Sequence, residues 1–474
     1  PCRFDPGSGY KLPAMREAFF MNIMNCGVVA KVVYNFNNHS YMIRRILFVL
    51  AVILPLPMLA AKPYAELPSR LAGSMMPYDF SGAEIQPIWP DSLKPVYVAH
   101  VARHGARYIS SAKKLEKLQG AISKAAAEGT LTKEGRRFDA LLKGVLAATG
   151  NQWGLLSQVG AEEERRLASD LYHLLPGLLR NARANAISTY VPRVVMTMYE
   201  FNHSLTVESS GISISASEGR GFSPLLRCFT ADSAYAAYRD NGDWRKVSEH
   251  LTDSIVSPEP AHRILGKSSG FSEKHLKKLT LEMYDVLQSL TAFGLPAPTD
   301  EFMSEADYRA CWEVDNLEHY LRNTITPLSD LAGEASAPLL ARILSDADAS
   351  LGARMEANAR RRAGMTQSAE EGYDANFYFG HAETLMPLLS LMRLPGCYSD
   401  SSDFFTLYDR WRDYDVVPLG ANLDIILLES PRGNSYVTLR LNGRFVAPMN
   451  GALIVSWSEY RVYLNELMMR VTAK

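Results

Sequence analysis

The sequence predicts an α/β fold in which a central sheet is flanked by helices and interrupted by one large helical insertion. Short β-rich segments alternate with amphipathic helical segments along residues 62–218, and this pattern returns along residues 372–474. Between them, residues 219–371 show helical periodicity with frequent Pro, Gly and Ser breaks. We therefore expect a core of residues 62–218 and 372–474, covered by an all-helical insertion of residues 219–371.

The composition is that of a globular protein with a sizeable core. Of 474 residues, 47% are hydrophobic and 10% are aromatic. The formal net charge is -1, which gives no support for binding to nucleic acid or to an anionic membrane. Any polyanion must therefore be bound by a local basic cluster.

The first 61 residues are expected to be absent from the mature protein. Residues 42–61 combine a basic start, an apolar run and a small-residue end, which is the layout of a secretory signal peptide. A transmembrane helix is the alternative, but the apolar run is shorter than the roughly 20 residues of a span and contains Pro55 and Pro57. Residues 1–41 have no clear period, and we interpret them as an upstream extension of the reading frame. We expect a bacterial periplasmic or secreted protein without stable membrane association after cleavage.

Three cysteines remain after this segment: Cys228, Cys311 and Cys397. An exported protein could form one disulfide, and Cys228 with Cys311 is the preferred pair because both fall in the same helical region. Connectivity is not readable from sequence, so other pairings stay open. No Cys-x-x-Cys spacing occurs among these three, so we expect neither a zinc site nor a thiol-redox site.

The central feature is an apolar strand that runs directly into a basic loop. Residues 96–101 predict a buried strand, and Arg-His-Gly-Ala-Arg follows at residues 103–107. Guanidinium groups offer paired donors that match phosphate oxygens, and Gly105 would let the backbone approach a ligand. A neutral His104 imidazole could attack a bound phosphorus. A solvated surface loop is the alternative, but spacing and context together favour a phosphate site.

Three helical segments and two strands follow this loop. Helices are expected over residues 110–129, 131–148 and 156–179. The first carries three lysines that are more often a solvated face, although their closeness to the loop keeps a polyphosphate-binding role open: Lys113, Lys114 and Lys117. A strand over residues 186–191 then delivers Arg193 at its end, before a helix over 194–205 and a strand over 212–217.

The helical insertion is expected to contain helices over residues 273–292, 308–322 and 338–363. The core pattern resumes with a strand over residues 376–379 that leads into Gly-His-Ala-Glu. Because proline is tolerated mainly in a first helical turn, Pro387 predicts a helix start near Thr384.

His381 and Glu383 would then lie at a helix N-terminus, where free N–H groups favour an anion. The chain is expected to end with a strand over 422–430 and a hairpin of residues 435–441 and 444–448 around Asn-Gly. We expect His100, which shares a strand with the basic loop, to be a packed structural residue.

These motifs resemble those of the histidine acid phosphatase superfamily, also called histidine phosphatase clade 2. Its Arg-His-Gly-x-Arg signature stands at residues 103–107, and its distant motif, often His-Asp, stands here as His-Ala-Glu at residues 381–383. The His-Ala-Glu version is similar to the multiple inositol-polyphosphate phosphatase branch, which includes phytases. The order of elements is similar over residues 90–450, although Ile109 replaces a frequent proline and residues 154–160 match a frequent Gly-rich stretch only loosely.

The resemblance implies a phosphoglycerate-mutase-like central sheet and a phosphohistidine mechanism. His104 attacks phosphorus, and protonated Glu383 donates to the leaving alcohol before its carboxylate activates water. The phosphate oxygens would be held by Arg103, Arg107, Arg193 and His381. No metal or other cofactor is needed by this scheme, and the chain has no His-Glu-x-x-His motif.

The implied substrate is an inositol polyphosphate such as phytate, converted to orthophosphate and lower inositol phosphates by a monomeric enzyme. Two alternatives stay open. The first is a histidine phosphatase for other small esters, such as sugar phosphates or bisphosphoglycerate. The second is a polyphosphate-binding protein without turnover.

Overall fold

The structure is a computed structural model that describes residues 69–296, 301–364 and 372–473. The predicted upstream extension and signal peptide lie outside these residues. The described residues belong to one compact unit, Tyr64–Lys474. None of the helices described there is both long enough and apolar enough to cross a membrane.

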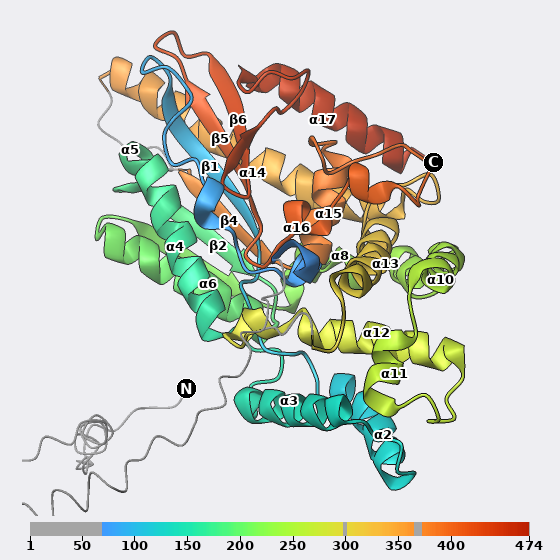
Figure 1. Cartoon of the computed structure of the whole chain (residues 1–474). Coiled ribbons are helices and arrows are strands. Elements are labelled where there is room, and N and C mark those ends of the chain that lie inside the picture. The colour runs from blue at the N-terminus through green and yellow to red at the C-terminus, as the bar shows by residue number, and fades with distance from the viewer. Residues whose placement is uncertain (1–68, 297–300, 365–371, 474) are drawn as a thin grey trace, which may run out of the picture. The chain divides into compact units, whose positions relative to one another are not determined.

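The centre of this unit is a mixed β-sheet, as predicted (Figure 1). Strand β1 (Lys94–Arg103) pairs in parallel with β4 (Ala375–Gly380) and antiparallel with β5 (Asn422–Glu429). The strand order is β3-β2-β4-β1-β5-β6-β7, with β8 paired to β6. The remaining bounds are β2 Arg183–Ser188, β3 Ser213–Glu218, β6 Ser435–Leu441, β7 Arg444–Val446 and β8 Val455–Ser456.

Register brings the ends of three neighbouring parallel strands to one edge of the sheet. Arg103 at the end of β1 lies opposite Gly380 at the end of β4. Ser188 at the end of β2 lies opposite Phe379 of β4. The loops that leave these strands therefore start side by side, in the position where open α/β sheets bind ligands.

The central strands β1, β4 and β5 are buried on both sides because helices cover both faces of the sheet. Successive β1 residues alternate between two cores, with Val98 and Ala102 in one and Ala99 and Val101 in the other. Figure 1 shows α4 and α6 on one side of the sheet and α15 and α17 on the other. Their bounds are α4 Gln158–Leu174, α6 Pro192–Glu208, α15 Ala382–Leu391 and α17 Trp457–Thr472.

Between β3 and β4, every regular element among the described residues is a helix, as the sequence predicts. They are η3 Arg220–Phe222, α7 Ser223–Leu226, α8 Cys228–Ala231, α9 Ser233–Asn241, α10 Trp244–Ile255, α11 Glu259–Leu265, α12 Glu273–Leu287, η4 Leu290–Phe293, α13 Glu305–Asn323 and α14 Leu331–Arg362. Two earlier helices, α2 (Lys113–Ala127) and α3 (Lys133–Thr149), pack against α12 and α11 (Figure 1). The domain boundaries given above stay a prediction.

Prolines mark three departures from the predicted helices. The helix expected over residues 156–179 is divided at Pro176 into α4 and α5 (Pro176–Leu179). Pro338 and Pro387 lie inside α14 and α15 rather than in their first turns. Helix α15 begins two residues before the predicted Thr384, and α14 begins before Pro338. Both helices continue through their proline because proline removes only one backbone N–H hydrogen bond, while packing stabilises the remaining turns.

Residues 62–94 are rich in Pro, Ser and Gly, which predicts an extended segment on the surface. For residues 69–82 this prediction is wrong. That stretch forms the 3₁₀ helices η1 (Ser69–Met75) and η2 (Phe80–Gly82). Leu71, Met76 and Tyr78 are buried, since this apolar stretch gains more from the core than from solvent.

The predicted disulfide between Cys228 and Cys311 is also wrong. Both residues and Cys397 are buried free thiols. Burial raises the pKa of Cys228 and of Cys397 to about 12, so these side chains behave as small apolar groups. The Asn-Gly hairpin is confirmed, with φ of 48° at Asn442 and 77° at Gly443.

Candidate active site

The predicted site residues come together at the carboxyl ends of β1, β2 and β4. His104 continues β1, and its backbone N–H donates to the Gly380 carbonyl at 3.1 Å. Its ring lies 5.7 Å from the His381 ring, centroid to centroid. Arg193 enters from the first turn of α6, after β2. These segments are far apart in sequence, so the sheet order assembles the site.

Helix α4 packs against the basic loop and binds its backbone. Glu163 accepts hydrogen bonds from the backbone N–H groups of Ala106 at 2.7 Å and Tyr78 at 2.8 Å. A Cβ atom at Gly105 would lie 2.8 Å from the Gly160 carbonyl, and one at Gly160 would lie 2.1 Å from the Ala106 carbonyl. The close approach of helix α4 therefore requires glycine at position 105. The expected role of Gly105 toward a ligand stays a prediction.

The surroundings of His104 favour a neutral imidazole. Its Nδ1 lies 2.9 Å from the Gly105 carbonyl, so Nδ1 carries the proton and Nε2 keeps its lone pair. Burial lowers the pKa of His104 well below its usual value, and the charges of Arg193 and Arg103 lower it further. A buried imidazole with a free Nε2 can attack an electrophile at neutral and acidic pH.

Arg103 is buried and anchored by two carbonyls. Its Nη1 donates to Ser74 at 2.6 Å and also to Val417. Burial and the charge of Arg107 lower the pKa of Arg103 to about 9, which still leaves a charged guanidinium at neutral pH. The anchoring fixes the direction of the remaining N–H groups.

Four arginines around His104 share one feature: each Nε is buried and has no hydrogen-bond partner among the described residues. They are Arg103, Arg107, Arg193 and Arg227. Buried donors of this kind call for an explanation, and a bound oxyanion supplies one. Burial also lowers the pKa of Arg107, and that of Arg193 to about 10. The four unpartnered Nε groups offer N–H donors to an anion in this site.

His381 and Glu383 open helix α15, as expected. His381 is buried, and its Nε2 lies 3.4 Å from both Thr189 Oγ1 and Arg227 Nη1. Burial lowers the pKa of His381 to about 3, aided by Arg193 and Arg227 and opposed by Glu383. A neutral imidazole therefore stands among the arginines.

Glu383 is ionised in this site, whereas the family resemblance implies a protonated donor. Burial raises the pKa of Glu383, but Arg239 and His381 outweigh burial and lower the pKa to about 2. Arg239 Nη2 lies 3.4 Å from Glu383 Oε1.

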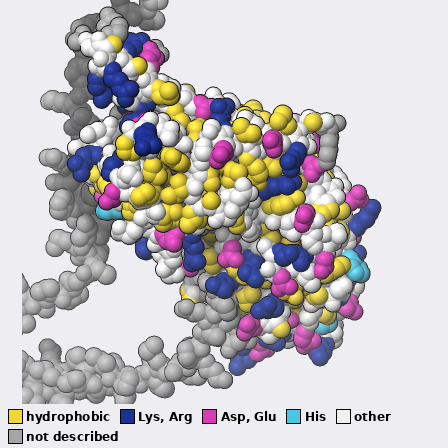
Figure 2. Space-filling model, turned by 90° about the horizontal axis from the view of Figure 1, so that it is seen from above, with side chains coloured by type: hydrophobic (Ala, Val, Ile, Leu, Met, Phe, Trp, Pro, Cys, Tyr) yellow, Lys and Arg dark blue, Asp and Glu magenta, His cyan; other side chains and the backbone are white. Residues whose placement is uncertain are grey.

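Arg227 and Arg239 were not predicted. Both come from the helical segment between β3 and β4, at the start of α8 and in α9, and each faces one residue of the His-Ala-Glu motif. On the face in Figure 2, acidic and basic side chains are interspersed. The positive charge of the site is thus a local feature, as the net charge of -1 requires.

The three predicted lysines lie on α2, and all are exposed. Lys114 pairs with Asp285 at 2.7 Å and Lys117 with Glu282 at 2.9 Å, both on α12. Asp285 also raises the pKa of Arg107 by its charge, against the effect of burial, so Lys114 lies near the margin of the site. The role of Lys113, Lys114 and Lys117 in binding stays a prediction.

One group of described residues could offer three ligand atoms to a metal ion. The donor atoms of Asp315, His319 and Asp413 lie within 4.8 Å of one another. Asp413 already accepts hydrogen bonds from Ser74 N, Trp312 Nε1 and His319 Nδ1. Its oxygens are satisfied by protein donors, so the group is better explained as a hydrogen-bond network that holds η1. The Ser74 carbonyl of η1 in turn accepts a hydrogen bond from Arg103.

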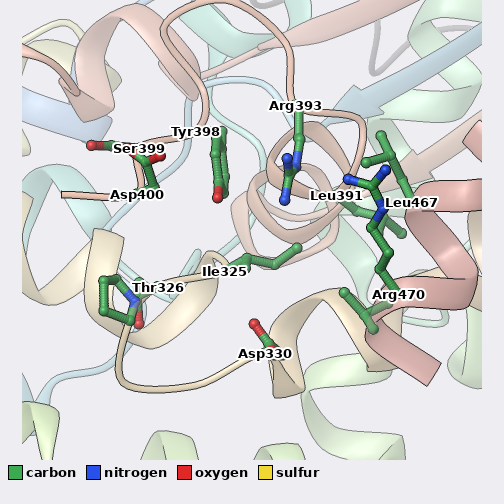
Figure 3. A pocket seen from close by; sticks show the side chains of 12 residues that line it. Ile325, Thr326, Asp330, Leu391, Arg393, Tyr398, Ser399, Asp400, Leu467 and Arg470 are labelled. Atoms are coloured by element: carbon green, nitrogen blue, oxygen red, sulfur yellow. The ribbon is translucent and has the colours of Figure 1, made fainter. Parts of the chain in front are cut away.

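A separate pocket of about 370 Å³ lies at the opposite end of α15 (Figure 3). Arg393 and Arg470 line it together with apolar side chains that include Leu391 and Leu467. None of the predicted site residues lines this pocket.

The comparison with known families agrees with this geometry. The family model of the histidine phosphatase superfamily (branch 2) matches residues 96–442. That range contains the basic loop, the His-Ala-Glu motif and every predicted site residue. The resemblance and the predicted fold class are thereby confirmed. Among curated proteins, none matches the sequence.

Solved structures with the same fold include a multiple inositol polyphosphate phosphatase and a phytase. A multiple inositol polyphosphate phosphatase from Bifidobacterium longum, in complex with inositol hexasulfate, has a TM-score of 0.68 at 16% identity, over 83% of this chain and 97% of that one. The same protein with phosphate has a TM-score of 0.66 at 15% identity, over 84% and 98% of the two chains. A phytase from D. castellii has a TM-score of 0.57 at 14% identity, over 84% and 85%. At these identities the likeness shows a shared fold.

Proposed function

Because the chain belongs to the histidine phosphatase superfamily, branch 2, we propose that this phosphatase hydrolyses inositol polyphosphates such as phytate. The observation that carries the proposal is the surroundings of His104. A neutral imidazole with a free Nε2 stands among four arginines whose buried Nε groups have no partner in the described part of the chain. This arrangement suits in-line attack on a phosphoryl group whose charge is offset by guanidinium donors.

The proposed reaction has two displacements at phosphorus. First, His104 Nε2 forms a bond to phosphorus while the bond to the ester oxygen breaks, and Glu383 protonates the leaving alkoxide. Next, the Glu383 carboxylate accepts a proton from water as the water oxygen bonds to phosphorus and the N–P bond breaks. Orthophosphate leaves, and His104 is restored with its proton still on Nδ1, where the Gly105 carbonyl holds it.

The proposed preference for a polyphosphate rests on the number of arginines in the site, which is larger than one phosphate group requires. Arg227 and Arg239 from the helical segment add two guanidinium groups to those of Arg103, Arg107 and Arg193. Guanidinium forks bind phosphate oxygens in pairs, so five of them can contact more than one phosphate group. The fold shared with an inositol polyphosphate phosphatase and a phytase supports the same substrate class.

The test is phosphate release from phytate by purified protein, beside two variants. His104→Ala should abolish release, and Glu383→Gln should slow it by roughly 10²–10⁴-fold, the size of general acid–base catalysis. An acid quench should trap phosphorylated protein from the wild type and none from His104→Ala. Fast release from sugar phosphates with none from phytate would reject the substrate. Tight phytate binding without release from any ester would support the binding-protein alternative.

The signal layout of residues 42–61 leads us to propose that the enzyme acts after export. The mass of protein purified from its native cells should then correspond to a chain that begins near residue 62. A mass that retains the apolar run would contradict cleavage.

A further inference from the structure

Arg239 forms a fixed ion pair with Glu383. Its Nη2 lies 3.4 Å from Glu383 Oε1, and its Nε donates to Asn323 Oδ1 at 3.0 Å. Its guanidinium carbon also lies 5.1 Å from the centre of the Phe229 ring. Only 13% of the Arg239 side chain is exposed, so this contact differs from a mobile surface pair.

Positive charge faces Glu383 from several elements. The cationic groups that face it are Arg103 and Arg107 from the β1 end and its loop, Arg193 from α6, Arg239 from α9 and Arg322 from α13. The other titratable groups that face it are His381, Tyr235 and Cys228. Burial raises the pKa of Glu383, and Arg239 is the first of the charges that reverse this effect.

This arrangement conflicts with the role of a proton donor. A carboxyl group must be neutral to protonate an alkoxide, yet a guanidinium at 3.4 Å favours the carboxylate. The pair must therefore separate before the first displacement. A second phosphate group on the substrate is a stronger partner for a guanidinium than one carboxylate oxygen.

We propose that Arg239 is a specificity-determining residue that leaves Glu383 for a second phosphate group of the substrate, so that Glu383 becomes a proton donor only when a polyphosphate is bound. This inference rests on the proposed function, and it explains how the same site would select a polyphosphate over a monophosphate. With a monophosphate, no second group competes, and Arg239 stays on Glu383.

The proton balance closes over one turnover. When Arg239 leaves, the Glu383 carboxylate takes a proton from solvent and passes it to the ester oxygen as the P–O bond breaks. It regains a proton from the attacking water as the N–P bond breaks. After orthophosphate departs, Arg239 pairs with Glu383 again, and that proton returns to solvent.

The test compares kcat/KM of wild type and Arg239→Gln on phytate, glucose phosphate and nitrophenyl phosphate. We expect a fall of roughly tenfold or more on phytate, the size of a lost charged hydrogen bond. On glucose phosphate we expect a rise of several-fold, because Glu383 is no longer held as a carboxylate, and the pH profile should extend to higher pH. Nitrophenyl phosphate should change by less than about twofold, because its leaving group needs no proton.

Two further variants separate this role from a structural one. Arg239→Lys keeps the charge and should restore part of the preference for phytate. Arg245→Gln removes an exposed arginine of α10 that lies over Trp244, outside the site, and should change none of the three values. An equal loss on all three substrates, or an unchanged preference, would overturn the inference. A wild type that hydrolyses none of the esters would instead overturn the proposed function, and the inference with it.

Discussion

Two adjacent carboxyl groups beneath the basic loop have different surroundings. Glu163 accepts two backbone N–H groups, which oppose the effect of burial, and its pKa is raised to about 7. Glu164 is fully buried, and neither of its oxygens has a partner among the described residues. Burial and the charge of Glu163 raise the pKa of Glu164 well above its usual value. Glu164 is therefore neutral in the folded protein.

Glu164→Gln should stabilise the protein at neutral pH and leave it unchanged in acid. In the unfolded chain this carboxyl group ionises with the usual glutamate pKa of 4.5, so above that pH folding must take up a proton. Stability then falls as the pH rises. Glutamine has the same shape without this cost, and we expect a gain on the order of 1 kcal/mol or more at about pH 8.

Urea unfolding at about pH 4 and about pH 8 measures this difference. Glu162→Gln is the matched control, because Glu162 is the exposed neighbour on the same helix. A gain from Glu164→Gln that is equal at both pH values would show that its folded-state pKa is not raised.

Residues of one contiguous motif are predictable from sequence, whereas residues that only packing brings together are not. His104 and both loop arginines stand in one contiguous motif after a recognisable strand, so their pattern alone indicates phosphate chemistry. Arg239 and its partner Glu383 are 144 residues apart, and Arg227 is 154 residues from His381. An arginine in an amphipathic helix looks like a solvated residue, and only the packing of the helical segment shows that these two face the site.

Helix α4 sets the position of the loop that carries His104. The helix approaches the loop so closely that two glycines face each other, Gly105 on the loop and Gly160 on the helix. Glu163 on the same helix binds the loop backbone. The sequence predicts this helix but not this contact, because an isolated glycine in a helical pattern has no signal for what it touches.

Gly160→Ala should therefore impair both stability and catalysis. Its Cβ would lie 2.1 Å from the Ala106 carbonyl, so loop and helix must move apart. We expect a loss of roughly 1–3 kcal/mol, the usual cost of overpacking. We also expect kcat/KM for phytate to fall by about 10²-fold, since a displacement of about 1 Å at a reacting group has an effect of that size.

Gly144→Ala in α3 is the matched control for thermal unfolding and kinetics. A Cβ there meets nothing within 4 Å. It should raise stability by roughly 0.5–1 kcal/mol through helix propensity, with unchanged kinetics. If Gly160→Ala behaves like this control, the loop is not held by α4 in the way described.

The order of the strands in the sheet brings the site residues together, and no local sequence pattern predicts this order. Strands β1, β2 and β4 are separated in the chain by helices, yet they become neighbours with their carboxyl ends at one edge. Each strand is predictable from its apolar run, and a parallel arrangement follows from the intervening helices. The pairing of β1 between β4 and β5 depends on long-range packing, and with it the meeting of His104 and His381.

The stability of the whole molecule should not depend on disulfides. A chain of this length buries enough apolar surface to fold without them, and Cys228, Cys311 and Cys397 are buried free thiols. We expect a protein that begins at residue 62 to have the same melting temperature with and without a thiol reductant. An aromatic disulfide reagent should react with no thiol of the native protein. In urea all three thiols should become reactive together, at the same urea midpoint as the unfolding measured by circular dichroism. A lower melting temperature in reductant, or one reactive thiol after unfolding, would show that two of the three are joined.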